Sequence, residues 1–387
     1  MSLKSSRREF LSAGLMLPVA GAAANLDFLN PDKPAPKFAK TPRLEYRTLG
    51  KTGLKVTTVG FGCMITSDPS VITRAADLGI NYFDSARGYQ NGNNERMVAA
   101  ALGNKRKDLV LSTKSIANNK EGLLKHLDTS LTELKTDYLD IWYLHSKDAP
   151  SAIHDDMIEA QQIAKQQGKI RFAGMSTHAL PKMTEWTVDK KAFDVVLTVY
   201  NFTMDAKMDE AIATVAKTGT GIVAMKVMAG GAHARRPGEQ VDTRMQREGA
   251  MLSALKWVLH RPNIHTTIPS MTDMDQLDEN LRAMAEEFVP ADEQTLAAHL
   301  QRIAPYYCRF CGECQGSCQK GLQVADTLRI LTYAEGYGQF ALARERFNEL
   351  PAHHTTARCG DCTECTVKCP HSIRVAERIS RAQELFA

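Results

Sequence analysis

Eight of the nine cysteines in this 387-residue chain occur in two runs that share the spacing CxxCxxCxxxC. The runs are Cys308, Cys311, Cys314 and Cys318, and then Cys359, Cys362, Cys365 and Cys369. Three thiolates two residues apart can hold one face of an iron–sulfur cube, while the fourth ligates a second cube. The spacing therefore predicts two [4Fe–4S] clusters, one on Cys308, Cys311, Cys314 and Cys369 and the other on Cys359, Cys362, Cys365 and Cys318. Zinc, which favours CxxC pairs, and disulfides are the alternatives.

A proline, Pro370, follows the second run, whereas Gln319 follows the first. With this spacing, the segment of about 308–387 resembles a bacterial-type two-cluster ferredoxin module. The resemblance implies a small, mostly helical domain that carries single electrons. We expect this domain to occupy residues 301–387.

Four polar residues follow or close successive predicted strands and could together perform acid–base chemistry. They are Asp84, Tyr89, Lys114 and His145. A tyrosine that donates a proton to a carbonyl oxygen needs its pKa lowered from about 10, which a nearby lysine cation can do. An aspartate can hold that lysine, and a neutral histidine can orient the carbonyl. Each residue alone could also be structural, as a helix cap, a solvated strand end or a loop histidine.

Short β-branched runs that alternate with helical patterns must position these side chains. The eight predicted strands are Val56–Gly62, Ile80–Phe83, Leu109–Lys114, Leu139–His145, Ile170–Met175, Asp194–Tyr200, Gly221–Lys226 and Ile264–Pro269. Most intervals match one βα unit, so the pattern predicts an α/β fold, a (β/α)₈ TIM barrel over residues 43–300, with chemistry after the strands. An open doubly wound sheet usually needs a GxGxxG turn, which the stretch after Gly60 lacks.

Several stretches in residues 44–290 resemble the aldo/keto reductase family, among them FDSARGY, STK, DYLDIWYLH, GKIRFAGMSTH and IPSMTDMDQLDENL. The resemblance implies that Asp84, Tyr89, Lys114 and His145 form the catalytic tetrad and that the substrate is a small carbonyl or alcohol. It also implies NAD(P)H contacts from Ser176, Asn201, Tyr200, Ser270, Glu279 and Asn280, with the Tyr200 ring stacked on the nicotinamide. Members of this family with a C-terminal ferredoxin-like module form a known subgroup, which the chain resembles to its last residue.

The predicted adenosine end of this site lacks the basic residues that NADPH-selective members carry after the Ile-Pro. Ser270 and Met271 occupy those positions, and Asp273 and Asp275 would repel a 2′-phosphate. The sequence therefore does not predict a preference for NADPH. The arginine-rich segment Ala229–Gly249 is either a cover over the cofactor or a solvated loop.

The N-terminus contains Ser6-Arg7-Arg8-Glu9-Phe10-Leu11, which resembles a twin-arginine export signal, followed by a mildly apolar stretch. We expect a signal peptide over residues 1–24, a proline-rich linker over 25–42 and no transmembrane segment in the mature form. Cargo of the twin-arginine machinery is already folded, as an iron–sulfur protein assembled in a reducing cytoplasm must be. The predicted location is therefore periplasmic or otherwise exported. The net charge of +4 gives no indication of a nucleic-acid partner.

These observations predict an exported oxidoreductase whose barrel acts on a carbonyl or alcohol and whose clusters pass electrons to a redox partner protein. The main alternative is a non-enzymatic electron carrier that keeps the barrel as a docking scaffold. In a third interpretation the clusters only brace the C-terminus.

Overall fold

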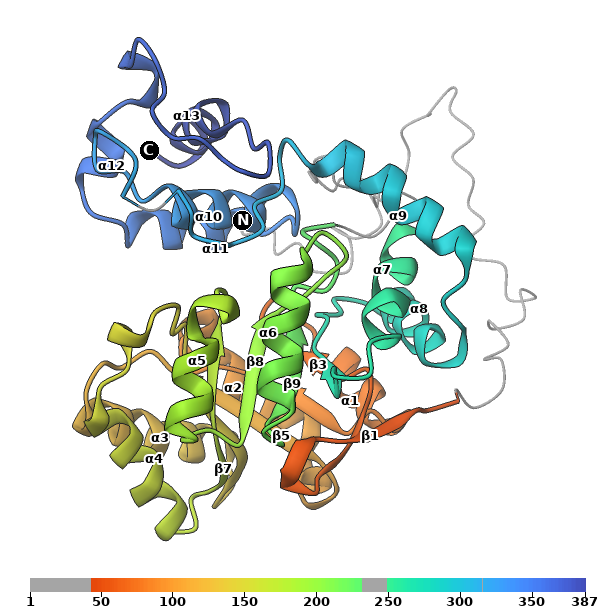
Figure 1. The fold of residues 1–387 in the computed structure, drawn as a ribbon. Helices are drawn as coiled ribbons and strands as arrows, with labels where there is room; N and C mark the ends of the chain where they lie inside the picture. Colours follow the sequence, from red (N-terminus) through yellow and green to blue (C-terminus); the bar gives the residue numbers. More distant parts are fainter. Residues whose placement is uncertain (1–42, 232–248, 315) are drawn as a thin grey trace, which may run out of the picture. The chain divides into compact units, whose positions relative to one another are not determined.

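The computed structural model describes residues 43–231, 249–314 and 316–387 (Figure 1). The predicted signal peptide, the linker 25–42 and residues 232–248 of the arginine-rich segment lie outside these described residues.

Eight parallel strands pair in chain order to form one sheet. They are β3 (Phe61–Gly62), β4 (Tyr82–Asp84), β5 (Val110–Ser115), β6 (Leu139–Leu144), β7 (Ile170–Thr177), β8 (Val195–Val199), β9 (Gly221–Met225) and β10 (Thr266–Thr267). The first and last strands also meet, because Gly60 N donates to Thr267 O at 2.8 Å and Thr267 N donates to Thr58 O at 2.9 Å. The sheet closes on itself, which confirms the predicted barrel and excludes the open doubly wound sheet.

The first predicted strand, Val56–Gly62, is wrong in its extent. Its start belongs to β2 (Lys55–Thr57), which pairs antiparallel with β1 (Tyr46–Thr48) in a separate hairpin. Only its end enters the barrel, at a point where β10 approaches closely. A Cβ at Gly62 would collide with the carbonyl oxygen of Ile268, so this closure needs a glycine.

Helices follow the strands, and all but the last two named here connect one strand to the next. They are α1 (Pro69–Asp77), α2 (Asn93–Leu102), α3 (Lys120–Leu134), α4 (Asp155–Gln166), α5 (Leu180–Lys190), α6 (Ala206–Ala216), α7 (Ala250–Leu259), α8 (Met274–Ala285) and α9 (Pro290–Ile303). Short 3₁₀ turns lie at Gly50–Thr52, Tyr89–Gly92, Gly103–Asp108, Pro150–Ala152 and Cys359–Asp361.

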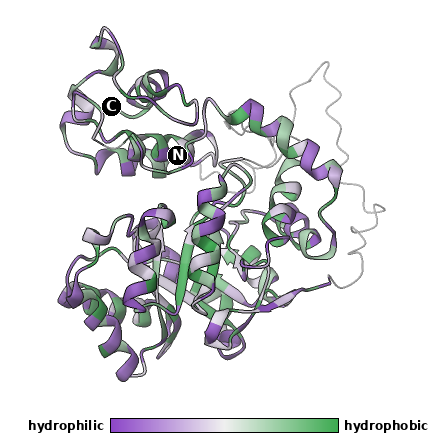
Figure 2. Ribbon diagram, in the orientation of Figure 1, coloured by the Kyte–Doolittle hydropathy of each residue, from purple (hydrophilic) through white to green (hydrophobic). Residues whose placement is uncertain are grey.

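Alternate residues of β4, β5, β6, β8 and β9 enter two separate apolar cores. On β6, Ile141 and Tyr143 pack inside the barrel with Leu49 and Leu54 of the β1–β2 hairpin, while Trp142 packs between strands and helices. Both faces of the strands are therefore buried, which explains their nearly continuous apolar sequence. Figure 2 shows this pattern as green central strands and helices of mixed hydropathy.

The C-terminal region is helical, with α10 (Val324–Glu335), α11 (Phe340–Asn348), α12 (His353–Thr356) and α13 (Val375–Phe386). Its predicted start at residue 301 falls inside α9, which continues to Ile303. A buried ion pair of 2.6 Å between Arg378 and Glu335 ties α13 to α10. No helix in the described ranges is long and apolar enough to span a membrane.

Candidate active site

The four predicted catalytic residues lie together at the carboxyl ends of neighbouring strands. Asp84 is the last residue of β4, and Tyr89 begins the 3₁₀ turn that follows it. Lys114 lies near the end of β5, and His145 directly follows β6. The loops at this end of a (β/α)₈ barrel form its active sites. The structure thus brings all four side chains to one mouth.

The Lys114 ammonium links the aspartate to the tyrosine. It donates hydrogen bonds to the Asp84 carboxylate, to Ser85 O at 2.7 Å and to the Tyr89 hydroxyl at 3.4 Å. The Ser112 hydroxyl donates to the other Asp84 oxygen at 2.7 Å. Both charged side chains are almost fully buried, so this contact fixes the lysine beside the tyrosine.

Tyr89 has a raised pKa, opposite to the direction expected from the sequence. Burial raises the pKa of the hydroxyl, and the Lys114 cation lowers it by less. Tyr89 therefore keeps its proton at neutral pH and can donate it. Lys114 limits the rise in the pKa of Tyr89, so the hydroxyl can still transfer its proton.

His145 stands edge-on to Tyr89, with 6.0 Å between the ring centroids. Burial lowers its pKa well below the ordinary value, and Lys114, His178 and Arg346 add to the effect. Its Nδ1 is buried and has no hydrogen-bond partner within the described ranges. A neutral ring that lines the mouth can donate one hydrogen bond to a carbonyl oxygen without a competing positive charge.

A pH profile tests the neutral state of His145. We expect kcat to show no inflection near pH ~6.5, the ordinary pKa of histidine, because the ring is already uncharged there. The measurement is kcat between pH ~5.5 and ~8 for the unmodified protein and for His145→Gln. An inflection near pH ~6.5 that is absent from His145→Gln would contradict this assignment.

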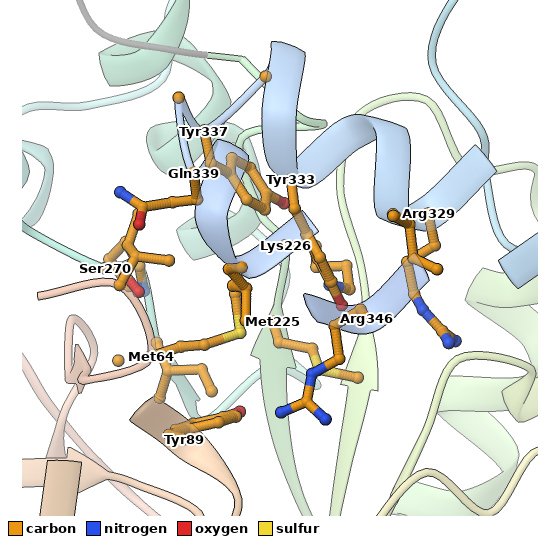
Figure 3. A pocket seen from close by; sticks show the side chains of 18 of the residues that line it. Met64, Tyr89, Met225, Lys226, Ser270, Arg329, Tyr333, Tyr337, Gln339 and Arg346 are labelled. Atoms are coloured by element: carbon orange, nitrogen blue, oxygen red, sulfur yellow. The ribbon is translucent and has the colours of Figure 1, made fainter. Parts of the chain in front are cut away.

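A pocket of about 1010 Å³ opens over these residues (Figure 3). Asp84, Tyr89 and His145 line it, together with residues of β9, the loop before α8, α10 and α11. Its volume is at the upper end of the range for small-molecule sites. It is therefore large enough for a substrate and part of a cofactor.

Three of the six predicted dinucleotide contacts lie at or beside one end of this pocket. Ser270 and Glu279 line it. The neighbouring Asn280 is fully buried, and neither polar atom of its amide has a hydrogen-bond partner in the described part of the chain. An unpartnered buried amide is costly unless a ligand satisfies it. This end therefore suits the adenosine part of a dinucleotide.

The other three predicted contacts already have protein partners. The Ser176 hydroxyl accepts a hydrogen bond from Ser146 N at 2.8 Å. The Asn201 amide donates to Lys226 O at 3.0 Å and to the Tyr307 hydroxyl at 3.1 Å. These two side chains are buried and do not line the pocket.

Tyr200 requires a correction, because its ring is not positioned to stack on a nicotinamide. It packs on Trp257 of α7, with 5.2 Å between centroids, and its hydroxyl bonds to Asp209 of α6. Strand alternation turns this side chain toward the outer helices. The pocket floor beside Tyr89 contains Met225 instead (Figure 3).

Sequence analysis did not identify four further polar residues that line the pocket. They are Lys226, Arg329, Tyr333 and Arg346. Lys226 directly follows β9, so its position at a strand end was a usable signal. The others belong to α10 and α11, where helical periodicity does not reveal what the polar face meets.

The eight cysteines of the two runs form no disulfide, and all but Cys311 and Cys362 lie in or beside one apolar cluster. Cys308 is buried, and burial together with Cys314, Cys311 and Cys369 raises its pKa to about 12. Burial also raises the pKa of Cys359, and here the contributing thiols are Cys365, Cys362 and Cys318. Backbone N–H groups donate to Cys308 Sγ from Phe310 and to Cys369 Sγ from His371, both at 3.4 Å. Throughout the described ranges, no three His, Cys, Asp or Glu side chains converge on a site for a single metal ion.

Comparison with known proteins finds a family match within the barrel. Residues 67–252 match the aldo/keto reductase family. This span includes the four clustered residues and ends before the two cysteine runs.

Relatives and solved structures agree with this match. The chain is 27% identical to the uncharacterized oxidoreductase YqkF of Bacillus subtilis, across 66% of this chain and 96% of the relative. It is 28% identical to L-galactose dehydrogenase of Arabidopsis thaliana, across 66% and 93%. The holo form of aldo-keto reductase AKR11C1 from Bacillus halodurans superposes with a TM-score of 0.57 at 25% identity, across 67% and 96%. Residues 67–252 are therefore an aldo/keto reductase family domain, and these matches support an oxidoreductase enzyme.

Proposed function

We propose that this protein is an exported iron–sulfur oxidoreductase that reduces a small carbonyl compound, or oxidises the alcohol, with NAD(P)H. Two [4Fe–4S] clusters exchange the electrons with a partner protein. One observation carries the enzymatic part: the Lys114 ammonium contacts both the Asp84 carboxylate and the Tyr89 hydroxyl at the barrel mouth.

The chain's own residues supply the proton chemistry. The Tyr89 hydroxyl gives its proton to the carbonyl oxygen during reduction and takes it back during oxidation. Lys114 stabilises the tyrosinate that forms, and Asp84 holds the lysine in place. His145 donates a hydrogen bond that orients the carbonyl. When bound, NAD(P)H supplies the hydride.

Interactions between the thiol groups of the two runs support two clusters with crossed ligands. Cys369 belongs by sequence to the second run, yet it acts electrostatically on Cys308 and Cys314 of the first. Cys318 of the first run acts in the same way on Cys359. In a cube each thiolate binds a different iron, so the four sulfurs need not converge on one point. The N–H groups directed at Cys308 and Cys369 are a known means of tuning cluster potentials.

Paired cysteine substitutions test the crossed pattern. In Cys311→Ser with Cys369→Ser, we expect one cluster to lose two ligands and the other to keep four, so that about half the iron remains. In Cys311→Ser with Cys318→Ser, each cluster loses a ligand and both become labile. Iron content and the low-temperature electron paramagnetic resonance spectrum of the reduced protein measure this. Equal iron loss in the two double variants would contradict the crossed assignment.

The dinucleotide part of the proposal is supported by the unpartnered Asn280 amide and by Ser270 and Glu279 beside it. Asp273 and Asp275 also line this end. Their charges disfavour a 2′-phosphate, so we expect NADH to serve at least as well as NADPH.

Export by the twin-arginine machinery belongs to the same proposal. The Ser6–Leu11 motif and the need to fold around clusters before leaving the cytoplasm support it.

Anaerobic optical titration of the cluster-loaded protein with NADH and then NADPH tests the proposal. We expect bleaching of the cluster absorbance, because two one-electron carriers together can accept the two electrons of a hydride. Cluster-free protein serves as the control for absorbance by the nucleotide itself. If neither nucleotide binds or bleaches the clusters, the barrel is not a dinucleotide-dependent donor and the proposal fails.

A further inference from the structure

Positively charged side chains lie over the catalytic mouth, contributed by both the barrel and the C-terminal helices. Arg329 and Tyr333 project from α10 and Arg346 from α11; Figure 3 shows the Tyr333 ring beside Lys226, which follows β9, and the Arg346 guanidinium directed toward Tyr89. None of the four belongs to the tetrad or to the predicted dinucleotide contacts. We call Lys226, Arg329, Tyr333 and Arg346 the cationic roof.

Lys226 is the central charge of the cationic roof. Its ammonium lies 5.0 Å from the ring centroid of Tyr333 and 5.3 Å from that of Phe310. Within the described ranges, no carboxylate lies within ion-pair distance of it. Burial lowers the pKa of Lys226, as expected for a cation without an adjacent counter-ion.

The two arginines keep part of their hydrogen-bonding capacity available. Arg329 pairs with Asp326 at 2.6 Å, and Arg346 pairs with Glu349 at 2.8 Å. The second terminal nitrogen of Arg346 donates to Gly88 O at 3.1 Å, next to Tyr89. A guanidinium has five N–H donors, so each arginine can still bind a ligand oxygen.

Three cations act on the Tyr333 hydroxyl. Burial alone would raise the pKa of its hydroxyl, yet Lys226, Arg329 and Arg346 lower it overall. Asp326, Glu345 and Glu349 also line the pocket, and two of them are already paired, Asp326 with Arg329 and Glu349 with Arg346. An anion at this point would therefore be attracted.

The cationic roof faces the catalytic side chains and not the adenosine end. Arg329 and Arg346 both help to lower the pKa of His145, and Tyr333 helps to raise the pKa of Tyr89. The adenosine end is instead lined by Asp273, Asp275 and Glu279. The pocket thus has a cationic end beside the reacting carbonyl and an acidic end away from it.

We propose that the substrate carries an anionic group, a carboxylate or a phosphate, close to its carbonyl, and that Lys226, Arg329 and Arg346 bind it while Tyr333 donates a hydrogen bond. The substrate is then held between the barrel and the C-terminal helices. Charge-assisted and bidentate hydrogen bonds suit arginine to either group. This inference rests on the proposed function for the reaction, and it adds the class of substrate.

Binding to the resting, cluster-loaded protein tests the inference without turnover. The probes are benzoate, inorganic phosphate and the neutral benzamide, measured by calorimetry at low salt. We expect benzoate or phosphate to bind and benzamide to bind at least ~10-fold more weakly, and the tighter anion identifies the preferred group. We expect Arg329→Gln and Lys226→Gln each to weaken anion binding by about tenfold or more.

Arg344→Gln is the matched control, because Arg344 is an exposed residue of α11 that does not line the pocket. It removes the same charge and should leave anion binding within about twofold. Equal binding of benzoate and benzamide, or equal losses in Arg344→Gln and Arg329→Gln, would overturn the inference.

The cations of the roof could instead bind the phosphates of the dinucleotide. A competition experiment distinguishes this possibility from binding of the substrate. Benzoate binding should survive saturation with NADH if the roof binds substrate, and its loss would overturn the inference. With active protein, the kcat/KM ratio of 4-carboxybenzaldehyde to its methyl ester should fall about tenfold in Arg329→Gln. A protein that binds benzoate through Arg329 but neither binds nor oxidises NAD(P)H would contradict only the proposed function.

Discussion

Replacing Tyr89 by phenylalanine is expected to lower kcat by about 10²- to 10⁴-fold, the range for loss of a positioned general acid. The hydroxyl lies 3.4 Å from the Lys114 ammonium and faces the pocket. Phenylalanine keeps the ring beside His145 but has no proton to donate. Steady-state turnover of a carbonyl substrate measures the effect, with iron content showing that the clusters remain.

The control for this substitution is Tyr138→Phe. Tyr138 is partly exposed, immediately precedes β6 at the opposite end of that strand from His145, and contacts Arg106 through its ring. It should change kcat by less than about twofold. If Tyr89→Phe retains the turnover of the unmodified protein, the tetrad does not perform the chemistry. Electron transfer to an artificial acceptor that persists in this variant would then favour the non-enzymatic carrier.

Removing one partner of the buried Lys114–Asp84 pair is expected to destabilise the barrel by about 3–5 kcal/mol. Either single change, Lys114→Met or Asp84→Asn, leaves the other group buried without its counter-charge. The corresponding fall in Tm is on the order of 5–15 °C. Thermal unfolding followed by near-ultraviolet circular dichroism reports the loss of barrel packing.

The double variant distinguishes loss of the pair from simple disruption. Asp84→Asn with Lys114→Met leaves no unpaired charge, so it should recover at least about half of the lost stability while remaining inactive. The exposed pair of Lys120 and Glu159 provides the control, since Lys120→Met should change stability by less than about 1 kcal/mol. Additive losses in the double variant would show that the two charges do not stabilise each other.

Features that depend on local spacing could be predicted from the sequence. The repeat of βα units predicted the barrel, and the strand ends predicted which residues would meet at its mouth. This works because parallel strands of a closed barrel bring their carboxyl ends to one side. The CxxCxxCxxxC spacing in the same way predicted two groups of thiols, which remain a prediction as cluster ligands.

Other features depended on contacts between segments far apart in the chain. The split of the first strand followed from closure against β10, about 200 residues later, where only glycine at position 62 fits. The direction of the Tyr200 ring followed from strand alternation and from its contact with Trp257. The net pKa direction of Tyr89 depended on how deeply the site is buried, which no spacing reveals.

The cationic roof depends on contacts that no local sequence pattern indicates. Lys226 ends a barrel strand, while Arg329, Tyr333 and Arg346 belong to helices more than a hundred residues later. Helical periodicity indicates which face of α10 is apolar, but not which partner its polar face meets. Their shared pocket arises from the packing of these helices over the barrel mouth. That packing depends on side-chain shape and on apolar contacts between segments far apart in the chain. The packing, and not a sequence motif, therefore determines which charges surround a substrate.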